Sequence, residues 1–213
     1  MPYNTLIQTK HLMSVTEFLI ESVETAYNNR KDIWQDSPFR QITLLSNDER
    51  GKWGEEFVSN LIKKLTDLDV EWDGDNNTNQ DDGVYDVVVS RNHSKKKSRV
   101  EIKTASRGTC NNPNWQHENV YASNKWDKLI FFDFDLFGFY LTVIDYSDMT
   151  FDKQHPVFGR KPTLRNNQDD KYKIDFGIQQ QKRGLESGHT FWYDITNPDE
   201  EGLKNHLIKH LYD

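Results

Sequence analysis

Two neighbouring segments carry charged residues in places where a β-strand would hold apolar ones. In a predicted strand over residues 98–105, Glu101 and Lys103 project from the same face, because side chains alternate along a strand. In a second predicted strand, over residues 84–90, Asp86 interrupts an apolar run. A charged group inside such a strand is costly unless it is paired or bound to something. We therefore expect these three side chains to form a site.

A basic turn over residues 91–97 joins the two predicted strands as a hairpin. If the register brings Asp86 beside Glu101, their carboxylates repel each other, and a hard divalent cation relieves this repulsion with oxygen ligands. Magnesium needs only one or two carboxylates, together with water and a substrate phosphate. We expect Mg²⁺ as the cofactor, with Mn²⁺ able to replace it.

These residue types suit the hydrolysis of a phosphodiester. Asp86 and Glu101 would hold the ion, which polarises the phosphate and lowers the pKa of a bound water. Lys103 would orient or deprotonate that water and offset the charge that develops on the phosphorane. An ordinary cross-strand salt bridge is the alternative for any one of these residues. The complete arrangement favours a catalytic site.

The same residues resemble the signature of a known family. Asp86, followed fifteen positions later by Glu101-Ile102-Lys103, is similar to the motif of the PD-(D/E)xK nucleases. These include type II restriction endonucleases, junction resolvases and repair nucleases. Tyr85 stands where the motif has its proline, a departure that the family tolerates. The resemblance implies a restriction-endonuclease-like fold and magnesium-dependent cleavage of DNA.

The resemblance extends to a preceding predicted helix over residues 48–67. Residues 51–56 read GKWGEE, which is similar to a Gly-Glu motif that many of these nucleases place before the metal-binding aspartate. It makes Glu55 a further catalytic residue and metal ligand. The apolar stripe of the helix centres near Gly54, so Glu55, roughly 110° away, borders the buried face, while Glu56, roughly 150° away, points to water. Gly54 would let the helix approach its neighbour closely.

The segment after the catalytic strand is predicted to hold a short helix around Glu118. Some relatives place a helix glutamine here that supports the active site, so the resemblance makes Gln116 a candidate catalytic residue. We expect His117 to be a surface or capping histidine. His206 and His210 lie four residues apart on the last predicted helix and could chelate a metal, but at this position we expect them to be solvated.

The remaining patterns indicate an α/β fold. Two predicted strands, over residues 128–134 and 139–144, are apolar on both faces, as strands in the middle of a covered sheet are. A capping box at Ser14 begins a predicted N-terminal amphipathic helix, and a strand over 190–195 precedes a helix over 198–211. We predict a mixed central β-sheet flanked by helices on both faces.

The chain is predicted to be a single nuclease domain. It would comprise an N-terminal helical region 1–46, a catalytic core 47–147, a DNA-contacting insert 148–187, and a C-terminal strand and helix 188–213. Between residues 153 and 183 the insert carries eight basic and three acidic residues, a net +5 in a chain of net −7. A solvated loop is the alternative. The DNA-binding candidates are Arg160, Lys161, Arg165 and Arg183.

Composition limits the other classes. A net charge of −7 argues against a protein that coats DNA through its whole surface. The single cysteine excludes an internal disulfide and fits a reducing compartment. No apolar run reaches the roughly eighteen residues of a membrane span, and the N-terminus does not resemble a signal peptide. We expect a cytoplasmic protein with no membrane partner and, since no phosphate-binding loop motif is present, no nucleotide cofactor.

Three functions are compatible with these patterns. The leading one is site-specific cleavage of double-stranded DNA, as in a type II restriction endonuclease, where a palindrome cut in both strands implies a homodimer. The second is a structure-specific repair or junction-resolving nuclease, which would recognise shape. The third is a catalytically inactive DNA-binding module. Against it stands the full set Glu55, Asp86, Glu101 and Lys103, because a binding module has no need of converging carboxylates that repel phosphate.

Overall fold

A computed structural model describes residues 19, 20, 22, 33–71, 85–91, 96–108, 113–122, 126–164 and 170–212. The chain divides into two units, Met1–Ile33 and Trp34–Asp213, and the fold described here is that of the second. The predicted N-terminal helix belongs to the first unit and lies almost entirely outside the described residues.

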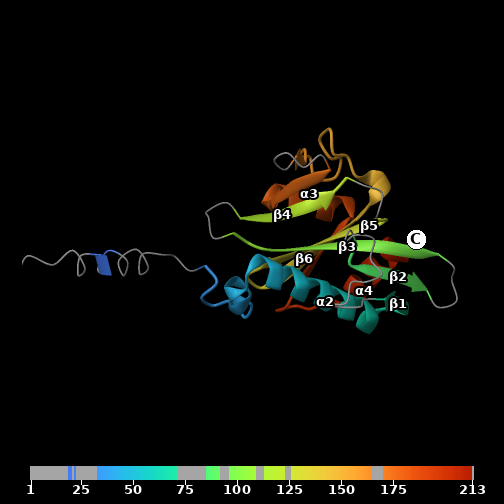
Figure 1. The fold of residues 1–213 in the computed structure, drawn as a ribbon. Coiled ribbons are helices and arrows are strands. Elements are labelled where there is room, and N and C mark those ends of the chain that lie inside the picture. The colour runs from blue at the N-terminus through green and yellow to red at the C-terminus, as the bar shows by residue number, and fades with distance from the viewer. Residues whose placement is uncertain are drawn as a thin grey trace, which may run out of the picture. The chain divides into compact units, whose positions relative to one another are not determined.

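Strands of the second unit form a main sheet in the order β1-β2-β3-β5-β6-β9 (Figure 1). Among these strands, only β3 and β5 pair in parallel. The predicted hairpin is the antiparallel pair of β2 and β3. The strands are β1 (Leu68–Glu71), β2 (Val87–Arg91), β3 (Lys97–Ser106), β5 (Lys128–Asp135), β6 (Gly138–Asp145) and β9 (Thr190–Asp194).

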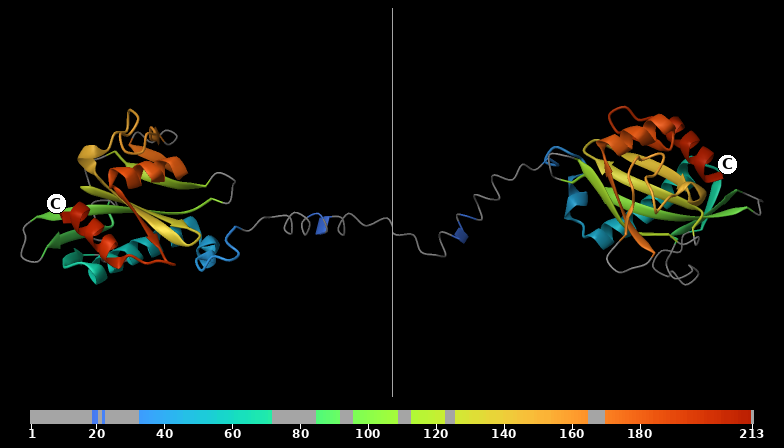
Figure 2. Two further views of the ribbon diagram at one scale, coloured as in Figure 1. Left: turned by 180° about the vertical axis from the view of Figure 1, so that it is seen from behind. Right: turned by 90° about the horizontal axis from the view of Figure 1, so that it is seen from above.

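A second, antiparallel sheet has the order β4-β8-β7, formed by Asn114–Tyr121, Lys171–Gly177 and Thr163–Leu164. The helices are α2 (Asn47–Leu65), α3 (Ile178–Ser187) and α4 (Glu200–Tyr212), with short 3-10 helices η1 (Arg40–Leu44) and η4 (Tyr146–Asp148). Helices α2 and α4 lie on one face of the main sheet, and the second sheet lies on the other with α3 (Figure 2). The predicted mixed α/β class, with helices on both faces, is confirmed.

The two central strands, β5 and β6, are buried on both faces as their apolar residues predicted. Toward the second sheet, Leu129 and Phe131 are fully buried in a cluster with Trp115 and Phe176. Toward α2, the ring of Phe132 stacks on the ring of Phe57, which belongs to that helix. Large buried aromatic side chains dominate the packing energy of such a core. The main sheet is therefore packed on both faces, which fixes the position of the polar groups on its strand β3.

Residues 114–121 form strand β4, so the short helix predicted around Glu118 is wrong. Trp115 and His117 are buried, whereas the residue after each of them is exposed, which is the alternation of a strand. This alternation breaks at a bulge, where Asn119 has φ 58° and Val120 returns to the buried side. The bulge hides the period of two in the sequence.

The predicted insert over 148–187 is an integral part of the fold. It contains β7, β8 and α3, and it contributes Phe158, Ile174 and Phe176 to the core between the sheets. The alternative of a solvated loop is therefore wrong for the described residues of this segment. The strands of this segment were not recognised in the sequence because the partner of β8 is β4, which lies far away in the sequence.

Candidate active site

The candidate site lies where β2 leaves β3. The described pairing of the two strands ends with Val87 opposite Val100. One residue earlier, the backbone N–H of Asp86 donates to the Val100 carbonyl at 2.9 Å, and its carboxylate accepts a hydrogen bond from the Ile102 N–H at 2.6 Å. Because Glu101 lies between these two residues, the hairpin sets Asp86 beside it. Beyond this point no described strand pairs with this edge of β3.

Glu101 and Lys103 form an ion pair on the face of β3 that looks toward the second sheet. Glu101 is 1% exposed, whereas the Lys103 side chain retains 20% of its exposure. Lys103 Nζ contacts Glu101 Oε1, while the buried Oε2 finds no hydrogen-bond partner in the described part of the chain. A buried carboxylate oxygen without a donor is costly, and such atoms in native structures call for an explanation such as an ion. The partly exposed side chain of Lys103 therefore connects the buried ion pair with solvent.

Helix α2 packs closely against β3 at Gly54. A capping box formed by Ser46 and Glu49 begins the helix. Gly54 is buried, and a Cβ at this position would overlap the side chain of Thr104 on β3. Only glycine permits this approach, in agreement with the packing role expected from the sequence.

The same approach brings Glu55 to the site. Glu55 is half-buried, whereas Glu56 is exposed, so the face expected from helix geometry is confirmed. The charges of Asp86 and Lys103 both act on Glu55. The structure thus places Asp86, Glu101 and Lys103 together at β3, and Glu55 of α2 lies within the range of their charges.

The site holds three carboxyl groups and one amino group. Burial raises the pKa of Glu101 to about 8, despite the opposing charge of Lys103. Burial and the charge of Asp86 raise the pKa of Glu55 to about 7, and burial also raises the pKa of Asp86. Burial lowers the pKa of Lys103, but the charges of Glu101 and Asp86 outweigh it, so that pKa lies above its ordinary value. The site therefore favours uptake of protons or of a cation.

These residues fit a hard divalent cation. Carboxylate oxygens are ligands that Mg²⁺ prefers, and the unpartnered Oε2 of Glu101 is such an oxygen. Within the described ranges, however, no three His, Cys, Asp or Glu residues lie together as a metal-binding group. Two carboxylates suffice when water and a phosphate complete the shell. Asp86 and Glu101 are therefore the better candidates for direct ligands, and Glu55 lies at the rim.

Gln116 does not join this site. Its side chain is exposed on β4, where its backbone position pairs with Asp175 of β8. The helix on which this glutamine was expected is a strand, so this part of the prediction is wrong. Strand alternation directs Gln116 away from the core between the two sheets.

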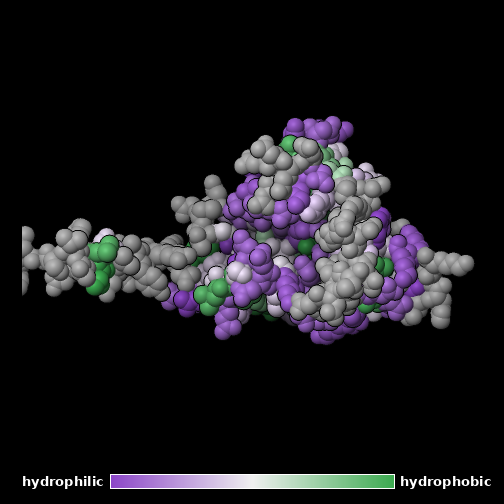
Figure 3. Space-filling view, in the orientation of Figure 1, coloured by the Kyte–Doolittle hydropathy of each residue, from purple (hydrophilic) through white to green (hydrophobic). Residues whose placement is uncertain are grey.

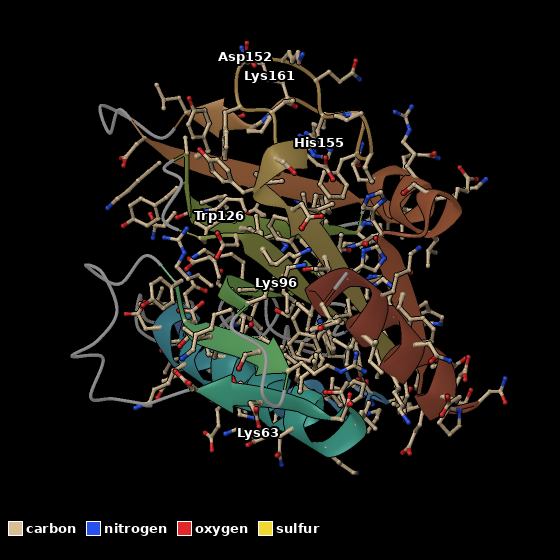
Figure 4. All side chains as sticks on the ribbon, turned by 90° about the vertical axis from the view of Figure 1, so that its right-hand side faces the viewer. Lys63, Lys96, Trp126, Asp152, His155 and Lys161 are labelled. Carbon is tan, nitrogen blue, oxygen red and sulfur yellow. The ribbon has the colours of Figure 1, made fainter. Side chains whose placement is uncertain are left out.

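Three of the four predicted DNA-binding residues, Arg160, Lys161 and Arg183, lie in the layer formed by the second sheet and α3. Arg160 donates to the Asp175 carbonyl at 3.2 Å, and Arg183 is exposed on α3. Lys161 is exposed at the outer end of this layer (Figure 4). Arg165 lies outside the described residues. A role of these residues in DNA binding stays a prediction.

Sequence reasoning missed a buried polar network. His117 is 2% exposed, so the surface role predicted for it is wrong. Its Nε2 lies 2.8 Å from Asp133 Oδ1, and Gln181 Nε2 donates to Asp133 Oδ2 at 2.6 Å. The network joins β4, β5 and α3. The signal available in the sequence was the alternation of residue types along β4, and the bulge obscured it.

His206 was also misplaced. It is 8% exposed, packed against the rings of Phe191 and His210 with centroids 5.9 and 4.6 Å away, and so is not solvated as expected. His210 is half-buried and donates through Nε2 to the Gly188 carbonyl at 2.8 Å. The face of α4 that carries these histidines therefore turns inward.

An apolar cavity of about 440 Å³ lies between η1, α2 and the ends of β5, β6 and β9. Its lining includes Phe39, Trp53, Phe57, Phe139 and Tyr193. None of the candidate catalytic residues lines this cavity, so it is not part of the carboxylate site.

Comparison of the chain with models of protein families, with curated proteins and with solved structures found no match. None of the described helices combines the length and apolar character needed to cross a membrane.

Proposed function

We propose that this chain is a Mg²⁺-dependent endonuclease of the PD-(D/E)xK group that cleaves double-stranded DNA at specific sites, as type II restriction endonucleases do. One observation carries the proposal. Asp86 is bonded to the backbone on either side of Glu101, through its own N–H to Val100 and through its carboxylate to Ile102. Glu101 is in turn paired with Lys103, at a point of β3 where no described strand continues the pairing of β2. The mixed α/β fold agrees with the fold that the resemblance implies.

Each residue has a role that its position supports. Asp86 and Glu101 would hold the ion, with the free Oε2 of Glu101 as one ligand atom. When bound, Mg²⁺ polarises the scissile phosphate and lowers the pKa of a coordinated water. Lys103, which reaches solvent, would orient the water whose oxygen bonds to phosphorus as the bond to the leaving oxygen breaks. Its charge would also offset that of the phosphorane.

The charge of the site favours an enzyme over an inactive DNA-binding module. Three carboxylates with raised pKa values make an empty site costly, and ionised carboxylates repel phosphate. A module that only binds DNA gains nothing from such a cluster. A bound divalent cation offsets the repulsion among the carboxylates and between the carboxylates and the phosphate.

Site-specific cleavage of both strands would require two active sites, so we propose a symmetric homodimer. Arg160, Lys161 and Arg183 are candidates for contacts to DNA from the second layer. The face of the molecule in Figure 3 is largely hydrophilic where its residues are described. Protein surfaces that bind DNA are polar and hydrated, so such a face is compatible with DNA binding.

The test is incubation of the purified protein with plasmid DNA and Mg²⁺, followed by mapping of the ends. Discrete fragments are the expected result. A smear would mean a nonspecific nuclease, and cleavage of branched substrates alone would mean a structure-specific one. Lys103→Ala should lose most of its cleavage rate while calorimetry still detects magnesium binding, because its role is in the transition state. No cleavage of any of these DNAs by the parent would refute the proposal.

A further inference from the structure

The apolar cavity beside η1 leaves large rings in contact with solvent. Its volume is about 440 Å³, and the lining rings of Trp53, Phe57 and Tyr193 are only partly buried. Aromatic side chains contribute most to packing energy when they are fully covered. A surface that keeps several of them half-exposed is typical of a place where another molecule binds.

Exposed apolar side chains border this cavity. Leu44 of η1 is 81% exposed and lies in the chain between Ile42 and Leu45, which both line the cavity. Ile195 lines it too and is 37% exposed, and its N–H donates to the carbonyl of Phe137, itself 46% exposed, at 3.1 Å. We call the cavity lining together with Leu44, Phe137 and Ile195 the η1 face. Monomeric proteins rarely gather large apolar side chains in this way.

The charge of the η1 face favours a second copy of the chain as its partner. None of the ten residues that line the cavity is charged, whereas 29% of all residues in the chain are. With a net charge of −7, two copies that meet through most other surfaces bring like charges together. At the η1 face they meet without that repulsion, and the contact buries no unpaired charge in the cavity.

The shape of the η1 face also suits a two-fold contact. A symmetric dimer uses the same patch on both copies, so the patch must be complementary to itself. Leu44 projects from the surface beside the cavity, so the Leu44 side chain of each copy can enter the cavity of the other. An apolar centre within a polar border is the usual anatomy of a homodimer interface.

We propose that the η1 face is the interface between two copies of this chain, with Leu44 of each copy seated in the cavity of the other. The choice of a second copy rests on the proposed function, because cleavage of both strands needs two active sites. Neither Leu44 nor the cavity lining includes a candidate catalytic residue, so Leu44 can be replaced without touching the carboxylate site.

The experiment measures the dimer Kd by analytical ultracentrifugation, at protein concentrations from nanomolar to micromolar. Leu44→Ser should raise the dimer Kd by about a hundredfold, because the two-fold axis repeats the loss of a buried leucine. Leu164→Ser is the matched control, since Leu164 is 49% exposed on β7 in the second sheet. It should leave the dimer Kd unchanged. Circular dichroism of both variants confirms that they are folded.

The plasmid assay provides a second measurement. Below its own dimer Kd, Leu44→Ser should nick one strand of the plasmid, whereas the parent at the same concentration makes linear DNA. Raising the concentration of the variant should restore linear product.

If Leu44→Ser associates as tightly as the parent, or if the parent stays a monomer at every concentration while it cuts both strands, the inference is overturned and the nuclease activity stands. If the parent forms a dimer that Leu44→Ser disrupts and yet cuts no DNA, the interface stands and the proposed function fails on its own.

Discussion

The Asp86 carboxylate accepts a hydrogen bond from the backbone N–H of Ile102 at 2.6 Å, so one side chain fixes the hairpin and also faces the site. Asp86→Asn keeps an oxygen acceptor but removes the charge. It should melt no earlier than the parent and should lose cleavage. Asp86→Ala also loses the hydrogen bond and should be less stable than Asp86→Asn by about 1 kcal/mol.

Thermal denaturation and a plasmid cleavage assay on both variants separate the two roles of this carboxylate. Both variants should bind DNA as tightly as the parent or more tightly, because a charge that repels phosphate is gone. Cleavage by Asp86→Asn at the parental rate would show that the proposed metal site is wrong.

The two adjacent glutamates of α2 provide a second test. Glu55 is half-buried at the rim and Glu56 is exposed. Glu55→Gln should slow cleavage by a smaller factor than Asp86→Asn, since Glu55 lies outside the pair of direct ligands, and Glu56→Gln should have almost no effect. Single-turnover cleavage rates at saturating Mg²⁺ measure both. Equal losses from the two substitutions would contradict the assignment of faces on this helix.

The raised pKa values of Glu55 and Glu101 predict how stability depends on pH without metal. Both groups have folded pKa values, about 7 and about 8, above the ordinary value of 4.5. The stability that they contribute is therefore fully present below pH 4.5 and is lost as pH rises through 7 and 8. Thermal denaturation from pH 5 to 9 should show a steeper alkaline loss for the parent than for Glu101→Gln.

Magnesium should reverse this loss, because bound cation replaces the protons. At a concentration one hundred times its Kd it would stabilise the folded chain by about 2.7 kcal/mol. The stabilisation should be larger at pH 8.5 than at pH 6 and absent in Glu101→Gln. Equal stabilisation of Glu101→Gln would place the bound cation elsewhere.

Two glycines of α2 form a matched pair. A Cβ at Gly54 would overlap Thr104, whereas a Cβ at Gly51 would have no atom within 4 Å. Gly51→Ala should stabilise the helix by roughly 0.5–1 kcal/mol, and Gly54→Ala should destabilise the chain by roughly 1–3 kcal/mol through overpacking. Denaturant unfolding measures both. The tight contact of α2 with β3 would be refuted if Gly54→Ala proved as stable as Gly51→Ala.

His206 predicts an acid-side loss of stability. Burial, together with the charges of His210 and Lys209, lowers its pKa from 6.5 to about 3. A group with a lowered folded pKa contributes stability that is present above pH 6.5 and lost as pH falls toward 3. Between pH 6.5 and pH 5 the loss should be about 2 kcal/mol. Denaturant unfolding at pH 5, 6.5 and 8 measures it.

His206→Phe keeps a ring in the same place and removes the titration. The difference between parent and variant should be constant above pH 6.5 and should change in favour of the variant below it. Parallel curves for the two proteins over this whole range would contradict the prediction.

The hairpin that carries the candidate site could be predicted from the sequence because its signals are local. Asp86 and Glu101 interrupt two apolar strands that a short turn connects, and strand alternation places Lys103 beside Glu101. Helix geometry was sufficient to separate Glu55 from Glu56. These rules need no knowledge of distant parts of the chain.

The second sheet could not be predicted in this way. Strand β4 is stabilised by pairing with β8, and strand propensity depends on such partners more than on the residues themselves. Its bulge at Asn119 interrupts the alternation, and the burial of His117 depends on Asp133 and Gln181 from two other elements. The site residue expected nearby, Gln116, was misplaced for the same reason.

The parallel pairing of β3 and β5 has a consequence for the order of folding. No tight turn can join two parallel strands, and the connection passes through β4 in the other sheet. Strand β4 in turn pairs with β8, where Tyr121 lies opposite Lys171. Contacts between such distant residues form slowly. A chain emerging from the ribosome would therefore leave one face of the strand that carries Glu101 and Lys103 unpacked until most of the protein has been made, so the candidate site would be completed late in synthesis.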